Sequence, residues 1–248
     1  MPNAPKKRTP WKTAGDVERL WIPTRNKSHD RNQKRIAAQV SPGLVGEGHF
    51  GKVFVGRMRF RNGAIARVAI KRFHLPIDDA LAARYQQTIG DLVRARVSLP
   101  KMAMAHLSNG EWVLVSQLFG STEKRSKFYR MDLAYLRMNR ESRIDAAQEL
   151  TRVANAGYAV HPMMGDIMEP FKPDRKGSVP LDIDLIARGG KSEPKIVFKQ
   201  LADEIEELRG YAESIRERKE ILATALQNAS PDLQKVLRSR FGLKPAER

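Results

Sequence analysis

The chain has 248 residues and no cysteine, which excludes disulfide bonds and cysteine-ligated zinc sites and is typical of a reducing compartment. Lys and Arg number 45 against 28 Asp and Glu, a formal net charge of +17, so the surface favours polyanionic partners such as nucleotides, nucleic acids or acidic proteins. No apolar run approaches a membrane span and the N-terminus has no apolar targeting core. We therefore expect a cytoplasmic or intracellular protein without a transmembrane segment, and delivery into a host cell stays an open alternative.

Residues 1–38 are polar, basic and rich in Pro, Asn, Lys and Arg. The apolar residues that offer this segment an anchor to a core are Trp11, Leu20, Trp21 and Ile22. The composition predicts a partly ordered N-terminal arm. Its basic clusters suit a localisation or recruitment signal, although a solvated tail is the simpler interpretation.

Residues 39–120 predict an antiparallel sheet with one helix laid across it. Four β-branched segments of alternating polarity, joined in pairs by Asn-Gly turns, predict the strands: 44–60, 66–73, 101–107 and 111–119. Between the two pairs, apolar residues recur at helical spacing over residues 77–97. The glycine-rich run GEGHFGKV interrupts the first strand segment.

Residues 121–248 are mainly helical by pattern. A linker precedes helical segments that begin at Tyr129 and at Arg140, and a loop-rich stretch covers residues 161–190. A long charged amphipathic helix follows, with a predicted break near Gly210. Ser230 is a natural N-cap for a last short helix that has a proline at its first position.

Two motifs in the first half carry the functional hypothesis. Residues 46–53 match G-x-G-x-F-G-x-V, and residues 68–71 read Val-Ala-Ile-Lys on a later strand. Each motif alone is weak, but together, in this order and at this spacing, they are specific. The pair resembles the N-terminal lobe of the protein kinase family. The resemblance implies an α+β, two-lobed protein kinase-like fold, with an antiparallel β N-lobe over residues 39–120 and a reduced, mainly helical C-lobe over residues 121–248.

The resemblance implies a site for ATP. Glycines in the turn let backbone N–H groups approach phosphate oxygens, and Lys71 would place a positive charge on the α- and β-phosphates. The residues implied to contact the nucleotide from the glycine turn and its neighbouring strands are Gly46, Glu47, Gly48, His49, Phe50, Gly51, Val53, Ala69 and Lys71. Without the motif context, Lys71 would be interpreted as a solvent-facing strand lysine.

The order of strands and helices in the kinase family implies roles for three further residues of the first half. The family pairs its strand lysine with a glutamate on the next helix, and this helix has none, so Asp91 is the candidate that lies nearest the family spacing. The alternative for Asp91 is a surface charge. Gln117 is implied to guard the adenine pocket, and Phe119 lies in the hinge segment that would offer backbone groups to adenine.

The second half offers two aspartates in the order that the family requires. Asp166 resembles the catalytic-loop aspartate in a Gly-Asp form, and Asp182 resembles the aspartate that binds Mg²⁺. Each has a structural alternative, a turn former for Asp166 and a strand-end charge for Asp182. The family's catalytic-loop asparagine is replaced by Phe171, so Glu169 and Asp174 are the alternative candidates for the second metal ligand. The family's Ala-Pro-Glu element is absent.

These residues imply an ATP- and Mg²⁺-dependent serine/threonine-protein kinase of compact form, similar to reduced kinase-like proteins of bacteria and phages, including effectors. Two alternatives stay open: a small-molecule kinase of the aminoglycoside or choline type, and a non-enzymatic pseudokinase scaffold. The positive charge favours a protein substrate with an acidic surface. Aromatic residues make up 7% of the chain and no familiar nucleic-acid motif is found, so the sequence predicts no dedicated nucleic-acid site. We expect a monomer.

Overall fold

The computed structural model describes residues 17–21, 44–60, 65–99, 101–107, 109–117, 128–130, 138–159, 166–168, 179–180 and 183–244. These residues form an α+β protein, with antiparallel sheets and helices that alternate little along the chain. The chain divides into two compact units: residues 1–86 with 100–118, and residues 87–99 with 119–248. No helix in the described ranges combines the length and the apolar character that crossing a membrane requires.

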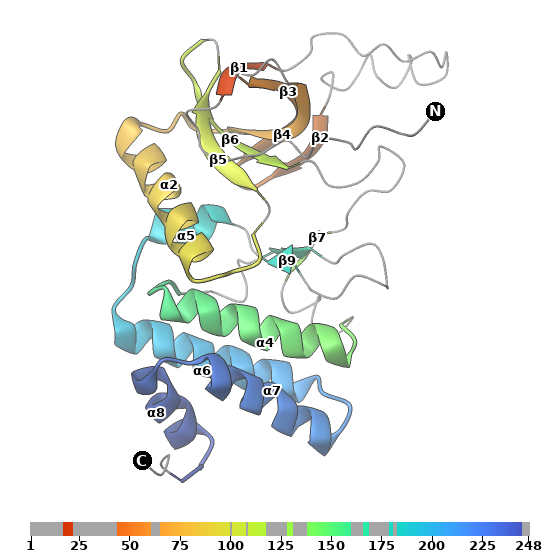
Figure 1. The fold of residues 1–248 in the computed structure, drawn as a ribbon, viewed down its shortest axis with the longest axis vertical. Coiled ribbons are helices and arrows are strands. Elements are labelled where there is room, and N and C mark those ends of the chain that lie inside the picture. The colour runs from red at the N-terminus through yellow and green to blue at the C-terminus, as the bar shows by residue number, and fades with distance from the viewer. Residues whose placement is uncertain are drawn as a thin grey trace, which may run out of the picture. The chain divides into compact units, whose positions relative to one another are not determined.

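The first unit is built on a six-stranded antiparallel sheet of order β1-β3-β4-β6-β5, in which β2 also pairs with β3. Its strands are β1 Val17–Trp21, β2 Leu44–Gly48, β3 Gly51–Phe60, β4 Ile65–Phe73, β5 Met102–His106 and β6 Trp112–Gln117. Strands β1 and β2 follow one another along β3, because β1 pairs with residues 57–60 and β2 with residues 51–54. Figure 1 shows how the sheet curls around its inner face. The four strand segments expected from alternation are confirmed, and β1 lies within the segment that was predicted as an arm.

The inner face of this sheet holds a small apolar core. It consists of Met58, Val68, Ile70, Val113 and Val115, none more than 1% exposed. These residues alternate along β3, β4 and β6, so the pleat turns every second side chain inward. The residues between them therefore belong to the opposite face of the sheet.

Helix α2, Asp79–Arg94, begins in the first unit and ends in the second. Asp78 caps its start, because its carboxylate accepts a hydrogen bond from the Leu81 N–H at 2.7 Å. The first half packs on the sheet, where the rings of Phe73 and Tyr85 meet edge to face at 5.4 Å. The helix ends before residue 97, the end predicted from the sequence, because the chain turns at Arg96 into a left-handed conformation with φ of 59°.

The second unit is mainly helical. Its helices are α4 Arg140–Asn155, α5 Ile183–Gly189, α6 Pro194–Gly210, α7 Ile215–Asn228 and α8 Pro231–Arg240. Helix α4 packs against α6 and α7, and α6 also packs against α8 (Figure 1). The break predicted near Gly210 is confirmed, since α6 ends there. Ser230 is the N-cap residue of α8 as expected, although its side chain makes no capping hydrogen bond.

A small antiparallel sheet completes the second unit. It joins β7 Phe128–Arg130, β8 Asp166–Met168 and β9 Val179–Pro180 in that order. The sequence pattern predicted a helix from Tyr129 onward, and this is wrong for Tyr129 and Arg130. Both pair with β8, so a partner distant in the sequence overrides the local helical preference.

Candidate functional site

The glycine-rich run is a tight β-hairpin turn. Gly48 at the end of β2 lies opposite Gly51 at the start of β3, and His49 and Phe50 form the two-residue connection. The rings of His49 and Phe50 meet edge to face with centroids 4.9 Å apart. The predicted loop is therefore a defined hairpin whose tip carries two aromatic rings.

His74, the residue directly after β4, contacts this turn through its backbone and its side chain. The backbone N–H of His74 donates to the Phe50 carbonyl at 3.0 Å, and its Nε2 lies 3.0 Å from the carbonyl oxygen of Gly48. Glu47 lies beside both, with its Oε1 at 3.7 Å from His74 Nε2 and at 3.3 Å from Lys52 Nζ. The turn is thus tied to the end of β4 on both sides of its tip.

Packing requires glycine at one of the three glycine positions of the turn and not at the other two. A Cβ on Gly51 would come within 2.1 Å of the Arg72 carbonyl oxygen, so the close pairing of β3 and β4 requires glycine there. A Cβ on Gly46 or on Gly48 would meet nothing within 4 Å. Packing among the described residues therefore does not explain Gly46 and Gly48.

The register of β3 and β4 places the predicted side chains on one face. Val53 pairs directly with Lys71, and Val55 pairs with Ala69. Because the inward residues of these strands are the even-numbered ones, these four belong to the opposite, half-buried face. The structure therefore brings the valine after the turn, Ala69 and Lys71 together.

Strand β6 continues this face. Leu114 pairs with Lys71, and Ser116 pairs with Ala69. The backbone of Gln117 ends β6 opposite Val68. Phe119, predicted for the hinge, lies outside the described residues.

Asp91, predicted as the partner of Lys71, has other neighbours within the second unit. Its Oδ2 accepts a hydrogen bond from the Tyr158 hydroxyl at 2.8 Å and lies 3.1 Å from Lys191 Nζ. Its Oδ1 accepts from Arg94, one turn later on α2. The side chain is 10% exposed, so this carboxylate is an anchor between α2 and the turns that follow α4 and α5.

The electrostatics of this cluster follow from the contacts. Burial alone would raise the pKa of Asp91, but the hydrogen bonds from Tyr158, Lys191 and Arg94 outweigh it, so the pKa lies below its ordinary value. Burial, followed by the negative charge of Asp91, raises the pKa of the Tyr158 hydroxyl. At neutral pH the carboxylate is charged and the phenol is a donor, which is the state that the hydrogen bond needs.

Of the carboxylates predicted for catalysis and metal binding, the structure describes the backbone of Asp166. Asp166 begins β8, where its backbone pairs with Arg130. Glu169 and Asp182 lie outside the described residues. Within the described ranges, no three His, Cys, Asp or Glu side chains come together as a metal site. The segment compared with the family's metal-binding loop continues as helix α5, in which Asp184 is buried with an exposure of 1%.

Sequence patterns missed three contributors to these clusters: His74, Tyr158 and Lys191. Each acts through a residue distant in the chain, so no local spacing marks it. A weak signal existed for Tyr158, since it follows a glycine at the end of a predicted helix. That glycine, Gly157, has a φ of +85°, which turns the chain so that Tyr158 is buried.

No model of a protein family matches the sequence, and no curated protein matches it significantly.

Proposed function

We propose that this protein is an ATP- and Mg²⁺-dependent protein kinase with a compact two-lobed kinase-like fold, which transfers the γ-phosphoryl group to Ser or Thr hydroxyls of a protein substrate. The observation that supports the proposal best is the shared face of Val53, Ala69 and Lys71 beside the glycine turn. A nucleotide on this face would meet an apolar surface for its base and a cation for its phosphates in the required order.

The chain's own residues divide the work as follows. Backbone N–H groups of the turn around Gly46 and Gly48 cradle the phosphates, and Lys71 neutralises the α- and β-phosphate oxygens. Asp166 accepts the proton of the substrate's Ser or Thr hydroxyl. The oxygen of that hydroxyl bonds to the γ-phosphorus while the bond between the γ-phosphorus and the β-phosphate oxygen breaks. Carboxylate oxygens are the ligands that Mg²⁺ prefers, so Asp182 and Glu169 would hold the metal, which offsets charge on the leaving phosphate.

The substrate is expected to carry acidic residues near its hydroxyl. The net charge of +17 attracts such a surface by long-range electrostatics and speeds encounter at low salt.

The test combines binding with turnover. Thermal unfolding is measured with and without ATP and Mg²⁺, and transfer of labelled γ-phosphate is followed on acidic, neutral and basic protein substrates. Ligand that binds the native state raises the melting temperature by mass action. We expect Lys71→Met to lose both responses, whereas Lys101→Met, an exposed lysine of the same unit, keeps both.

Substitution of the two aspartates distinguishes an active kinase from a non-enzymatic scaffold. Asp182→Ala should weaken Mg²⁺-dependent ATP binding and turnover, whereas Asp166→Ala should bind ATP and lose transfer. Stabilisation of the wild type by ATP without transfer to any substrate would replace the kinase proposal with the pseudokinase scaffold. No stabilisation and no transfer would reject both.

A further inference from the structure

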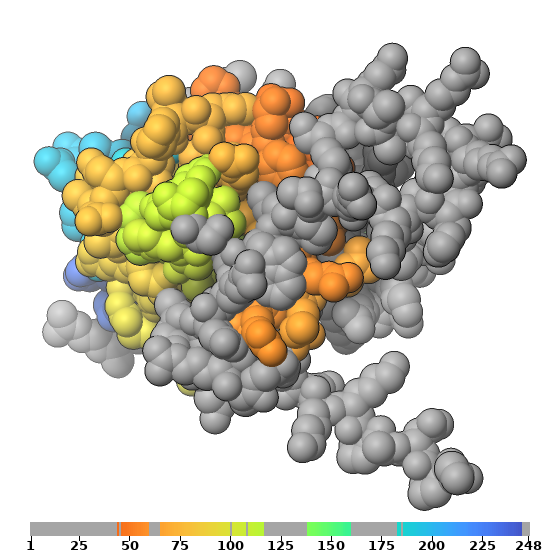
Figure 2. Space-filling model, turned by 90° about the horizontal axis from the view of Figure 1, so that it is seen from above, coloured from red at the N-terminus to blue at the C-terminus, as the bar shows by residue number. Residues whose placement is uncertain are grey.

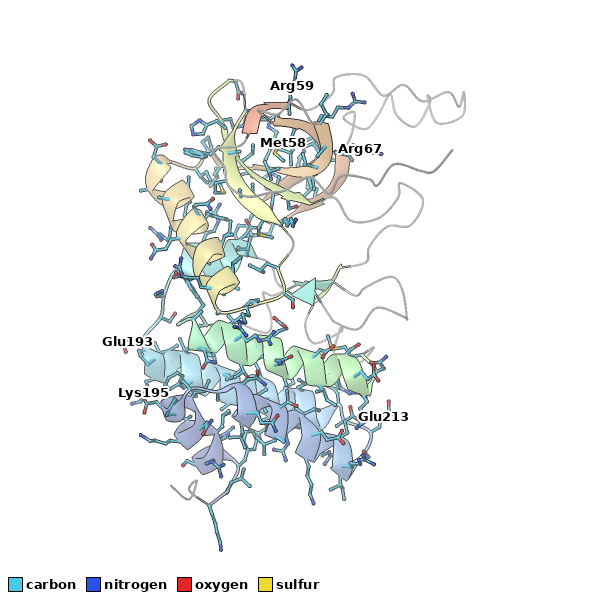
Figure 3. The ribbon with its side chains drawn as sticks, viewed as in Figure 1. Met58, Arg59, Arg67, Glu193, Lys195 and Glu213 are labelled. Carbon is cyan, nitrogen blue, oxygen red and sulfur yellow. The ribbon has the colours of Figure 1, made fainter. Side chains whose placement is uncertain are left out.

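Three arginines lie on the outer face of the sheet, at the end of β3 and β4 away from the glycine turn. Arg57 pairs directly with Arg67 in the β3–β4 ladder, and Arg59 pairs with Ile65. All three arginines are exposed. Figure 3 shows Met58 inside the curled sheet and the Arg59 and Arg67 side chains outside it. In Figure 2 parts of the segment that holds β2 and β3, in orange, reach the surface. We call Arg57, Arg59 and Arg67 the arginine row.

The Arg57–Arg67 pair of this row is electrostatically unfavourable as it stands. Like charges directly opposite each other on neighbouring strands destabilise a sheet. Within the described part of the chain, neither Arg57 nor Arg67 has a carboxylate partner. By contrast, Arg72 on the same strand β4 is neutralised by a two-point contact with Glu111 at 2.8 and 2.7 Å. The sheet therefore satisfies one of its exposed arginines internally and leaves the Arg57–Arg67 pair for an external anion.

The register of β1 extends the row. Arg19 of β1 occupies the position opposite Arg59, and Trp21 occupies the position opposite Arg57. Two adjacent rows of the ladder thus read Trp21, Arg57, Arg67 and Arg19, Arg59, Ile65 across three strands. This pattern combines basic and aromatic positions, and no segment of the sequence shows it because the residues come from three strands.

We propose that the arginine row binds the backbone of a single-stranded nucleic acid. Guanidinium groups bind phosphate in a bidentate manner, and positions two residues apart on a strand repeat at about 6.6 Å along one direction, as a polyanion crossing the sheet requires. At the level of backbone register, Trp21 occupies the position opposite Arg57, beside the row. An aromatic residue at this position favours a ligand with bases over an acidic peptide, which has no bases. The net charge of +17 is complementary to such a ligand. Binding to the arginine row does not depend on phosphoryl transfer.

The experiment measures binding of a fluorescein-labelled oligouridylate by fluorescence anisotropy, without ATP, over a series of salt concentrations. The test variant is Arg57→Gln/Arg67→Gln. The charge-matched control is Lys195→Gln/Lys199→Gln, two exposed lysines of α6 in the other unit. We expect the test variant to lose roughly tenfold to a hundredfold in affinity. Its slope of log K against log salt should fall by about 1.4, because two phosphate contacts disappear. The control should stay within about twofold of wild type.

A second variant, Arg57→Lys/Arg67→Lys, keeps the charge and loses the guanidinium forks. It should bind more weakly than wild type with an unchanged salt slope. Thermal unfolding checks the fold of each variant, and the Gln pair should be at least as stable as wild type because the like-charge repulsion is removed. Equal losses in the Gln pair and the α6 control would overturn the proposal, since attraction would then be general. Binding of polyglutamate through the row in preference to the oligonucleotide would also overturn it.

Discussion

Val53 and Lys71 are direct cross-strand partners, and Ala69 lies on the same face of the sheet one pair further along. Two alanines of β4 lie on opposite faces of this ladder: Ala69 on the proposed nucleotide face and Ala66 beside the apolar core. The two positions therefore allow the effects of binding and packing to be separated with the same substitution.

We predict that Ala69→Leu reduces ATP binding by roughly tenfold or more while the free energy of unfolding changes by less than about 1 kcal/mol, because the added atoms fill the ligand face. Ala66→Leu should instead cost about 1–3 kcal/mol by overpacking the core. Chemical denaturation and ATP-dependent thermal shift give the two readouts. If Ala69→Leu bound ATP as well as wild type, the proposed nucleotide face would be wrong.

The glycine turn gives a second matched pair. Gly51→Ala forces a Cβ onto the Arg72 carbonyl oxygen and should destabilise the protein by about 1–3 kcal/mol. Gly48→Ala meets no atom within 4 Å, so its stability should change by less than about 0.5 kcal/mol, while its affinity for ATP falls. Denaturant midpoints compare the two variants. Equal destabilisation by both would contradict the turn geometry described above.

The buried ion pair of the helical unit gives a third prediction. Arg143 Nε lies 2.5 Å from Glu217 Oε1, and the two side chains are 3% and 2% exposed. Arg143→Met leaves a carboxylate buried without its partner and should cost about 3–5 kcal/mol. The double variant Arg143→Met/Glu217→Leu should recover a large part of that loss, because no buried charge remains. Denaturation of the two single variants and the double variant completes the thermodynamic cycle.

The left-handed residue that ends α2 predicts a stabilising substitution. Arg96 has a φ of 59°, which glycine adopts without the Cβ penalty. Arg96→Gly should therefore stabilise the protein by about 1 kcal/mol. Arg96→Ala keeps the Cβ and should bring no such gain. The melting temperatures of both variants check the argument, and a gain with alanine alone would show that the arginine side chain, rather than φ, sets the energy.

The Asp91 cluster predicts a pH dependence of stability. The pKa of Asp91 is lower in the folded chain than in the unfolded chain, so its contribution is complete above the unfolded pKa, about 3.9, and is lost as pH falls through the folded pKa. Tyr158→Phe removes a donor to this carboxylate and should cost about 1–3 kcal/mol at neutral pH. The cost should shrink in acid. Urea denaturation at neutral and acidic pH measures both, and a cost independent of pH would assign Tyr158 a packing role alone.

Much of the local structure was predictable from the sequence. Alternation located strands β2 to β6 of the first unit but not β1, and Gly210 marked the end of α6. The glycine turn and Lys71 were found together because both motifs are short and depend on backbone conformation and strand register within two consecutive hairpins. Such signals are encoded by neighbouring residues, and the structure preserves them.

The tertiary structure alone decided which distant side chains meet. Asp91 contacts Tyr158 and Lys191, which are both distant in sequence, as well as its near neighbour Arg94. His74 also contacts the glycine turn, which is distant in sequence. The opposition of Arg57 and Arg67 likewise depends on a register that a shift of one residue would abolish. These contacts depend on the packing of segments far apart in the chain, where burial and charge at one position are set by residues that no local pattern contains.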